Sequence, residues 1–418
     1  MSGSSRALAI FTLVVAGEMI FSLPFHVARF FRPTVLDVFD LSNAALGDIF
    51  AFYGVLAMLA YPPGGILADH FSARKLLSLS LLATAAGGCY LAVIPSQSGM
   101  YALFAFWGVT SILLFWGALI RATREWGGKF QQGRAFGLLE GGRGLVAAVF
   151  ASMAVWLFSL LLAEPTGETG TVQQRQAMQA VILFYTLATA LTAALVWFFV
   201  PETPADRPDI GLAPLRDLNH VIRRRVVWLQ AAVVVCAYCG YKGLDNYGLY
   251  ANQVLGMDEV EAARFISLAA YLRPVAAILV GLLADRFTAS RMVSLMFLLL
   301  AVGYALLSLL FPSLVALVLI YANLVVTFFA VYALRGIYFA LLEETGIDAG
   351  HTGAAVGLIS FIGFTPDVFF ASLAGRILDA SPGIVGHQLF FSMLVGFAVI
   401  GLLSSLVLLS GFRRKAFT

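Results

Sequence analysis

The chain has 418 residues, of which 61% are hydrophobic and only 12% are charged, and its mean hydropathy is +0.91. So few charges cannot cover the surface of a water-soluble protein of this size, which excludes a soluble globular protein. The formal net charge of +3 is too small to indicate nucleic-acid binding. We therefore expect an integral membrane protein.

Twelve apolar runs follow one another along the chain, and each is long enough to cross a hydrocarbon core of roughly 30 Å as a helix. The expected fold is an all-α membrane protein, since barrel strands would give short alternating segments instead. No small-residue cleavage signature follows the first run, so we interpret it as a retained helix. The runs lie near 7–31, 45–68, 74–94, 100–124, 132–162, 178–200, 226–250, 261–284, 290–311, 313–339, 351–374 and 385–410.

Basic residues gather in alternate loops, which predicts the orientation of the chain. The positive-inside rule places both termini and the segment 201–225 in the cytoplasm. That segment is rich in proline and arginine, and it predicts a linker between a six-helix bundle at 1–200 and a second one at 226–418. The loop residues behind this prediction are Arg74, Lys75, Arg124, Lys129, Arg134, Arg207, Arg216, Arg223, Arg224, Arg225, Arg286, Arg291, Arg413, Arg414 and Lys415.

A loop motif occurs twice, which indicates an internal repeat. It reads G-x3-D followed by basic residues, after the second and the eighth run, with an offset of 216 residues between the copies. A second pair, Gly133/Gly137 and Gly353/Gly357, has an offset of 220. Two matches in the same order predict two pseudo-symmetric bundles that rock about a central site. An aspartate at a helix end can pair with a basic residue or a helix N-terminus, which predicts a conformational latch. Its residues are Gly65, Asp69, Arg74, Lys75, Gly281, Asp285 and Arg291.

Cofactor and enzyme chemistry are not expected from this sequence. The three cysteines, Cys89, Cys236 and Cys239, lie in apolar runs, and no second ligand pair accompanies the C-x-x-C. We predict no metal and no cofactor. The chain has no phosphate-binding loop for ATP hydrolysis and no nucleophile constellation, so we expect no enzyme.

Ionisable residues inside the apolar runs are candidates for function, because an unpaired charge in a bilayer is costly. Glu140/Arg143 and Lys242/Asp245 are spaced i, i+3, so each pair either neutralises itself or takes part in transport. Arg273 precedes Pro274 near mid-membrane, and Asp367 is either its partner or a protonation site. The residues expected to couple transport to protons are Glu18, Glu140 and Asp367, with His26 a further proton carrier.

The repeated loop motif and the twelve runs resemble the major facilitator superfamily, over nearly the whole chain. The resemblance implies a central cavity lined chiefly by helices 1, 4, 7 and 10, opened alternately to each side. The segments Phe25–Phe30 and Tyr241–Tyr247 further resemble the organophosphate:phosphate antiporter branch, also called sugar-phosphate permease-like. In that branch one basic residue from each half holds the phosphate, which would give these roles to Arg29 and Lys242.

These features predict a secondary active transporter for a small organic anion, working by alternating access as an antiporter or symporter. Basic side chains on cavity helices favour carboxylate or phosphate. We expect a monomer in a bacterial inner membrane, in contact with lipid, carrying the anion with protons or a counter-anion and binding no nucleic acid. The alternative is a proton-coupled efflux pump for drugs or other hydrophobic solutes. The predicted substrate-binding residues are Arg29, Lys242, Asp245, Tyr241, Asn246, Arg273, His26 and Trp116.

Overall fold

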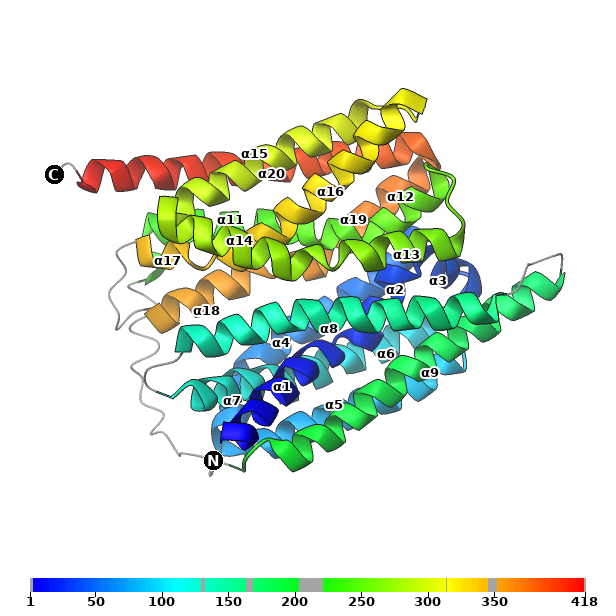
Figure 1. Ribbon diagram of the computed structural model, residues 1–418, viewed down its shortest axis with the longest axis horizontal. Helices are drawn as coiled ribbons and strands as arrows, with labels where there is room; N and C mark the ends of the chain where they lie inside the picture. The colour runs from blue at the N-terminus through cyan, green and yellow to red at the C-terminus, as the bar shows by residue number, and fades with distance from the viewer. Residues whose placement is uncertain are drawn as a thin grey trace. The chain divides into compact units, whose positions relative to one another are not determined.

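The computed structural model describes residues 3–128, 132–162, 168–202, 221–312, 314–344 and 352–416. Lys129 and most of the predicted linker, 203–220, lie outside these ranges. Within them the regular structure is helical, with no strand (Figure 1).

Twelve helices of the described residues are long and apolar enough to cross a membrane, which confirms the predicted fold class. Their positions agree with the apolar runs to within a few residues, except that the sixth begins at Gly170 rather than near 178 and the eleventh ends at Ala380 rather than near 374. Seven spans are single helices: α4 (Asn43–His70), α5 (Ala73–Ala92), α8 (Gln132–Leu161), α9 (Glu168–Phe199), α15 (Ala289–Leu309), α16 (Leu314–Ile337) and α20 (Ile384–Ala416).

The other five spans are interrupted. They are α1 (Gly3–Met19) with the π-helical η1 (Ser22–His26) and α2 (Val27–Phe30); α6 (Gln97–Val109), π-helical η2 (Thr110–Trp116) and α7 (Gly117–Gly127); α11 (Arg225–Gly243), the 3₁₀ turn η3 (Leu244–Asn246) and α12 (Tyr247–Gln253); α13 (Glu259–Ala269) and α14 (Leu272–Phe287); and α18 (Thr352–Gly363) and α19 (Pro366–Ala380). Short helices α3 (Arg32–Val38) and α17 (Leu341–Glu344) lie between spans.

Proline explains three of these interruptions. Pro24 lies in η1, Pro274 near the start of α14 and Pro366 at the start of α19. A proline lacks the backbone N–H that would continue the helix, and its ring clashes with the preceding turn. Irregular backbone inside a membrane is tolerated where it is covered by protein or lines a wet cavity. The interruptions therefore mark the places where polar groups can be positioned inside the spans.

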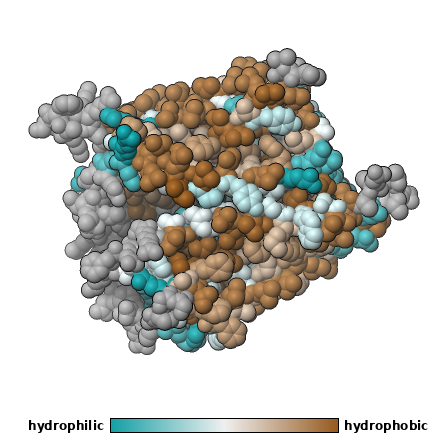
Figure 2. All heavy atoms as spheres, in the orientation of Figure 1, coloured by the Kyte–Doolittle hydropathy of each residue, from teal (hydrophilic) through white to brown (hydrophobic). Residues whose placement is uncertain are grey.

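The surface is strongly apolar. Large hydrophobic side chains such as Leu59, Phe198 and Val318 are 68%, 76% and 74% exposed. Figure 2 shows one face on which hydrophobic residues predominate, with hydrophilic residues mostly toward its margins. In water such a surface would drive aggregation. A lipid environment accounts for it, and with the twelve spans it makes the chain an integral membrane protein.

The structure divides into two compact units. Unit 1 comprises Met1–Pro208 with Asp245–Tyr271, and unit 2 comprises Asp209–Leu244 with Leu272–Thr418. The helices α12 and α13 thus pack with the first six spans. In unit 1 the Thr34 hydroxyl donates to Glu259 over 2.8 Å, and Gln174 donates to the same carboxylate. The domain boundaries predicted from the sequence, at residues 200 and 226, remain a prediction.

Glycine allows close packing at a few positions within unit 1. A Cβ added at Gly88 on α5 would overlap the Thr186 hydroxyl oxygen on α9. Near the loop motif, the close approach falls at Gly64, where a Cβ would lie 3.0 Å from the Ile112 carbonyl oxygen. Added Cβ atoms at the motif residues Gly65 and Gly281 meet no described atom within 4 Å. In the first motif copy, the close helix approach is therefore made at Gly64, one residue before the motif glycine Gly65.

Candidate functional site

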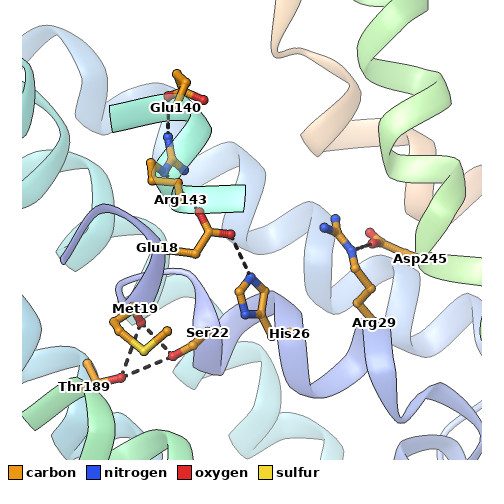
Figure 3. Close-up of polar contacts among 9 residues, drawn as sticks. All are labelled: Glu18, Met19, Ser22, His26, Arg29, Glu140, Arg143, Thr189 and Asp245. Atoms are coloured by element: carbon orange, nitrogen blue, oxygen red, sulfur yellow. Dashed lines mark hydrogen bonds and ion pairs between the residues drawn. The ribbon is translucent and has the colours of Figure 1, made fainter. Parts of the chain in front are cut away.

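A buried charge cluster in unit 1 joins the first span to α8 (Figure 3). The Glu18 carboxylate lies 3.2 Å from His26 Nε2 and 3.1 Å from Arg143 Nε. Arg143 also donates from Nη1 to Glu140 over 2.7 Å. Glu18, His26 and Arg143 are at most 3% exposed, whereas the Glu140 side chain is 48% exposed. The expected i, i+3 pair of Glu140 and Arg143 is present, but it is extended to Glu18.

Aromatic rings frame this cluster. The Arg143 guanidinium lies 5.7 Å from the ring centroids of both Phe21 and Trp116, within range of a cation–π interaction. The rings of His26 and Tyr185 are in edge contact, with centroids 6.2 Å apart. Sequence reasoning missed Tyr185 and Phe21, because an aromatic residue in an apolar run carries no signal of what it faces. It placed Trp116 at a substrate site, and the structure places it against Arg143.

A second ion pair in unit 1 joins Arg29 to Asp245 (Figure 3). Arg29 Nε lies 2.5 Å from Asp245 Oδ1, and the two side chains are 8% and 7% exposed. Arg29 extends from α2, just after the π-helical turn, and Asp245 lies in η3. This buried position beside a carboxylate excludes snorkelling of the Arg29 side chain to the membrane interface.

In unit 2 the charges are centred on Asp367, at the start of α19. Its carboxylate lies 3.2 Å from Lys242 Nζ and accepts from the Tyr238 hydroxyl at 3.1 and 3.0 Å. Beside them, the Arg335 guanidinium stacks on Tyr241 at 4.0 Å from the ring centroid. Sequence reasoning considered Arg273 as the partner of Asp367, which is wrong. Arg273 is buried on α14 and forms no ion pair with Asp367, because the nearer cation on α11 takes that place.

All eight predicted binding residues lie in or next to the interrupted spans. His26 and Arg29 flank the end of η1, and Trp116 ends η2. Tyr241, Lys242, Asp245 and Asn246 surround η3, and Arg273 begins α14. Interrupted spans free backbone groups and turn neighbouring side chains in different directions. The eight predicted binding residues therefore lie at or next to irregular helix segments.

The predicted latch has a partner that sequence reasoning did not name. Arg74 and Lys75, at the start of α5, both pair with Glu202, which follows α9, and the Lys75 distance is 2.7 Å. The hydrogen bond from Lys75 and the nearby Arg74 and Lys75 charges lower the pKa of Glu202. Asp69 makes no ion pair with a described residue. The basic residues of the motif thus tie α5 to α9.

The second copy of the motif is arranged differently. Asp285 and Arg291 are exposed and do not pair with each other. In place of a basic side chain at the helix start, the Ser290 backbone N–H donates to Glu344 over 3.2 Å. A carboxylate at a helix N-terminus is favourable, because the unpaired N–H groups there carry partial positive charge. The two motif copies therefore share their sequence pattern but not their contacts.

A pocket of about 580 Å³ opens beside the motif in unit 1. It is lined by residues of α4, η2 and α7, including Asp69, Trp116 and Arg121. Arg121 donates to the Ala68 carbonyl over 2.7 Å and pairs with Glu125 at 2.8 Å. A cation at the end of α4 stabilises its unpaired carbonyl groups, which fixes the rim of the pocket.

Candidate metal ligands are sparse in the described part of the chain. It contains no group of three or more His, Cys, Asp or Glu side chains arranged to hold a metal ion. Cys236 and Cys239 are buried free thiols on α11, and Cys89 is an exposed free thiol on α5.

Comparison with known proteins agrees with this architecture. The chain is 27% identical to the inner membrane protein YihN of Escherichia coli (strain K12), over 99% of this chain and 97% of that protein. It is 29% identical to the probable nitrate/nitrite antiporter NarK1 of Thermus thermophilus, over 60% of this chain and 56% of that protein. The crystal structure of a mutant of the nucleoside transporter NupG has a TM-score of 0.75 at 12% identity, over 97% of this chain and 99% of that chain, and so shares the fold.

The family model described as Major Facilitator Superfamily matches residues 11–365. That match covers most of the interrupted first span, both copies of the loop motif and the charges around η3. With the twelve spans, it identifies the chain as a member of the major facilitator superfamily, a family of membrane transporters.

Proposed function

We propose that the protein is a secondary active transporter for a small organic anion, working by alternating access. The proposal rests on where Arg29 and Lys242 lie and on what they contact. Both are buried basic side chains beside helix interruptions, and each is held by a carboxylate, Asp245 or Asp367. Arginine and lysine side chains at such positions can bind an anion inside the membrane spans.

The chemistry of these groups suits carboxylate or phosphate cargo. Arginine presents a planar fork of N–H donors that matches both groups, and lysine adds a compact positive charge. Next to Asp245, Asn246 is 3% exposed, and its side-chain oxygen has no hydrogen-bond partner among the described residues. We propose that it accepts a hydrogen bond from a substrate hydroxyl. The relative named a probable nitrate/nitrite antiporter supports an anionic cargo.

We further propose a bacterial inner membrane as the location, with both termini in the cytoplasm. YihN is named as an inner membrane protein. The orientation rests on the basic loops, including Arg74 and Lys75, because positively charged loops stay on the cytoplasmic side.

Uptake into proteoliposomes tests the proposal. Purified protein is reconstituted and offered labelled glycerol 3-phosphate, glucose 6-phosphate, lactate, isethionate, nitrate, glucose and a lipophilic dye in separate assays. We expect uptake of at least one anion and none of glucose or dye. Arg29→Gln and Lys242→Gln should each reduce that uptake at least about tenfold, as loss of a charged hydrogen bond does. Arg264→Gln is the matched control, because Arg264 is an exposed arginine on α13. If none of the organic anions is carried, the proposal is wrong, even if nitrate is taken up.

A second candidate function is proton-coupled efflux of hydrophobic solutes. It is favoured by the cluster of Glu18, His26, Arg143 and Glu140, because buried carboxylate and imidazole groups can exchange protons. Under this alternative the dye is expelled by a proton gradient. Glu18→Gln then abolishes expulsion, whereas Arg29→Gln leaves it largely intact. The same proteoliposomes, with dye inside and a pH gradient imposed, separate the two functions.

A further inference from the structure

Arg335 lies in the last turn of α16, but its side chain extends toward the middle of the membrane. The Gln230 side chain on α11 donates to the Tyr338 carbonyl over 3.3 Å, which aligns the end of α16 with the early part of α11. From this level the Arg335 guanidinium reaches the rings of Tyr238 and Tyr241. These rings lie roughly two and three helical turns further along α11 than Gln230. The guanidinium therefore points into the span and away from the helix end.

This direction is the opposite of the one expected for a residue that only anchors the helix end. An arginine near the end of a span ordinarily extends to the interface, where its charge is hydrated. A charge directed into the membrane is costly against lipid, so such residues face a protein interior or a water-filled route. Arg335, Tyr238 and Tyr241 are all half-buried. Arg335 is thus a partly accessible cation inside unit 2.

Tyr241 fixes the orientation of the guanidinium. Arg335 Cζ lies 4.0 Å from the centroid of the Tyr241 ring and 5.9 Å from that of Tyr238, and the two rings are stacked with centroids 5.8 Å apart. A ring contacts a guanidinium through its face, whereas a carboxylate or phosphate binds its N–H edge. The aromatic contact and an anion contact can therefore exist at the same time.

The backbone that carries Arg335 is held by two neighbouring helices. A Cβ added at Gly336 would lie 3.2 Å from Ala277 Cα, so α16 packs closely on α14 at this point. On another side, the hydrogen bond from Gln230, a fully buried side chain of α11, reaches Tyr338. Rigid support of this kind is what a binding residue requires for precise placement.

Tyr238 connects Arg335 to the group around Lys242. Its ring lies beside the Arg335 guanidinium, and its hydroxyl donates to Asp367, which pairs with Lys242 over 3.2 Å. Two basic residues from different spans are thus arranged around one tyrosine. An anion recognised by both would receive the planar fork of an arginine and the compact charge of a lysine.

We propose that Arg335 is a further anion-binding residue of this transporter and that Tyr241 is its positioning residue. The inference rests on the proposed function, transport of an organic anion. The N–H edge of Arg335 donates to the oxygens of a carboxylate, phosphate or sulfonate group, while the Tyr241 ring holds the face of the guanidinium. Tyr241, which the sequence predicts as a binding residue, then acts through Arg335.

The half-saturating concentration for uptake tests Arg335. It is measured in proteoliposomes for each organic anion of the panel above that the wild-type protein carries. Arg335→Gln should raise it at least about tenfold, as loss of a charged hydrogen bond does. This concentration does not depend on how much of the variant is folded, so a merely structural role of Arg335 would lower the maximal rate instead.

Arg286→Gln is the matched control. Arg286 is also an arginine of unit 2 that lies over an aromatic ring, with its Cζ 5.4 Å from the centroid of Phe287. It is exposed in the last turn of α14. The control variant should keep the wild-type half-saturating concentration.

A pair of variants tests Tyr241. Tyr241→Phe and Tyr241→Leu both lack the hydroxyl, but only the phenylalanine keeps a ring under the guanidinium. The half-saturating concentration should be at least about threefold higher in Tyr241→Leu than in Tyr241→Phe, as loss of a cation–π contact predicts. Equal values in the two variants would contradict the positioning role.

Chemical modification tests binding in the wild-type protein itself. Butane-2,3-dione reacts with arginine side chains, and peptide mass spectrometry reports the modified fraction at each one. A saturating concentration of a transported organic anion should lower the modification of Arg335, whereas glucose should not. Arg286 serves as the internal control and should be modified equally in all samples.

Several results would overturn the inference. An unchanged half-saturating concentration in Arg335→Gln contradicts it, and so does equal modification of Arg335 with and without the transported anion. Absence of modification in the protein without any anion would contradict an accessible guanidinium. Each of these results leaves anion transport itself intact. If the wild-type protein carries no organic anion, the proposed function is wrong, which is a distinct result.

Discussion

Arg29 and Asp245 occupy equivalent positions of the two sequence repeats, and they form a buried ion pair. They are 216 residues apart, which is also the offset between Asp69 and Asp285 of the loop motif. Parallel repeats are related by an axis along the membrane normal, and residues close to such an axis meet their own equivalents. Identical charges would repel one another there. The two repeats carry opposite charges at this position, so the contact is an attraction.

This ion pair predicts a strong coupling between the two positions. Arg29→Gln or Asp245→Asn alone breaks this buried ion pair, and each should lower the free energy of unfolding by about 3–5 kcal/mol. The double variant removes both charges and should regain most of that loss. Thermal unfolding of the detergent-purified variants measures the coupling, and additive losses in the double variant would show that the pair is not coupled.

Tyr238→Phe should weaken the position of Asp367. The substitution removes the hydroxyl that donates to both carboxylate oxygens but keeps the ring on which Arg335 lies. Hydrogen bonds to charged groups contribute about 1.5–3 kcal/mol, so we expect a loss of stability in that range. Tyr90→Phe is the control, because Tyr90 is a 47% exposed tyrosine on α5. Equal stability of Tyr238→Phe and wild type would argue against the contact.

Glu202 should contribute to stability only where its carboxylate is ionised. Its pKa is lowered by the hydrogen bond from Lys75 and by the Arg74 and Lys75 charges, so the folded protein binds the proton less tightly than the unfolded chain. The contribution is therefore present above the ordinary glutamate pKa of about 4.5 and is lost as pH falls through the lowered value.

The measurement compares wild type with Glu202→Gln by thermal unfolding between pH 8 and pH 3. Wild type should have the higher melting temperature from pH 8 to 5, and the difference should vanish in acid. High salt should reduce it at every pH, because exposed ion pairs are screened. A difference that grows toward acid would contradict the assignment.

Gly88→Ala should destabilise unit 1. The added Cβ would overlap the Thr186 hydroxyl oxygen and lie 2.7 Å from a Leu23 methyl carbon, so α5 and α9 would have to move apart. Overpacking of this kind costs about 1–3 kcal/mol. Gly396→Ala on α20 is the matched control, because its added Cβ meets no described atom within 4 Å. Thermal unfolding in detergent distinguishes the two, and equal effects would contradict the close packing.

Sequence reasoning named the ionisable residues of the spans but not all of their partners. It recognised Glu140 with Arg143, whose spacing on the uninterrupted α8 brings them together. It did not find that Lys242 pairs with Asp367 or that Asp245 pairs with Arg29, because each of these contacts joins two different spans. It also missed Glu202, because the sequence does not distinguish this acidic residue from other loop residues. Its contacts with Arg74 and Lys75 depend on the packing of α5 against α9.

The twelve spans and the internal repeat were determined by the sequence alone. A bilayer requires about 20 consecutive apolar residues per helix, and that requirement is local, so it can be read along the chain. The partners of the buried charges were decided only by the tertiary structure. An ion pair such as Lys242 with Asp367 depends on which helices are adjacent and where each is interrupted, and both follow from packing of the whole chain.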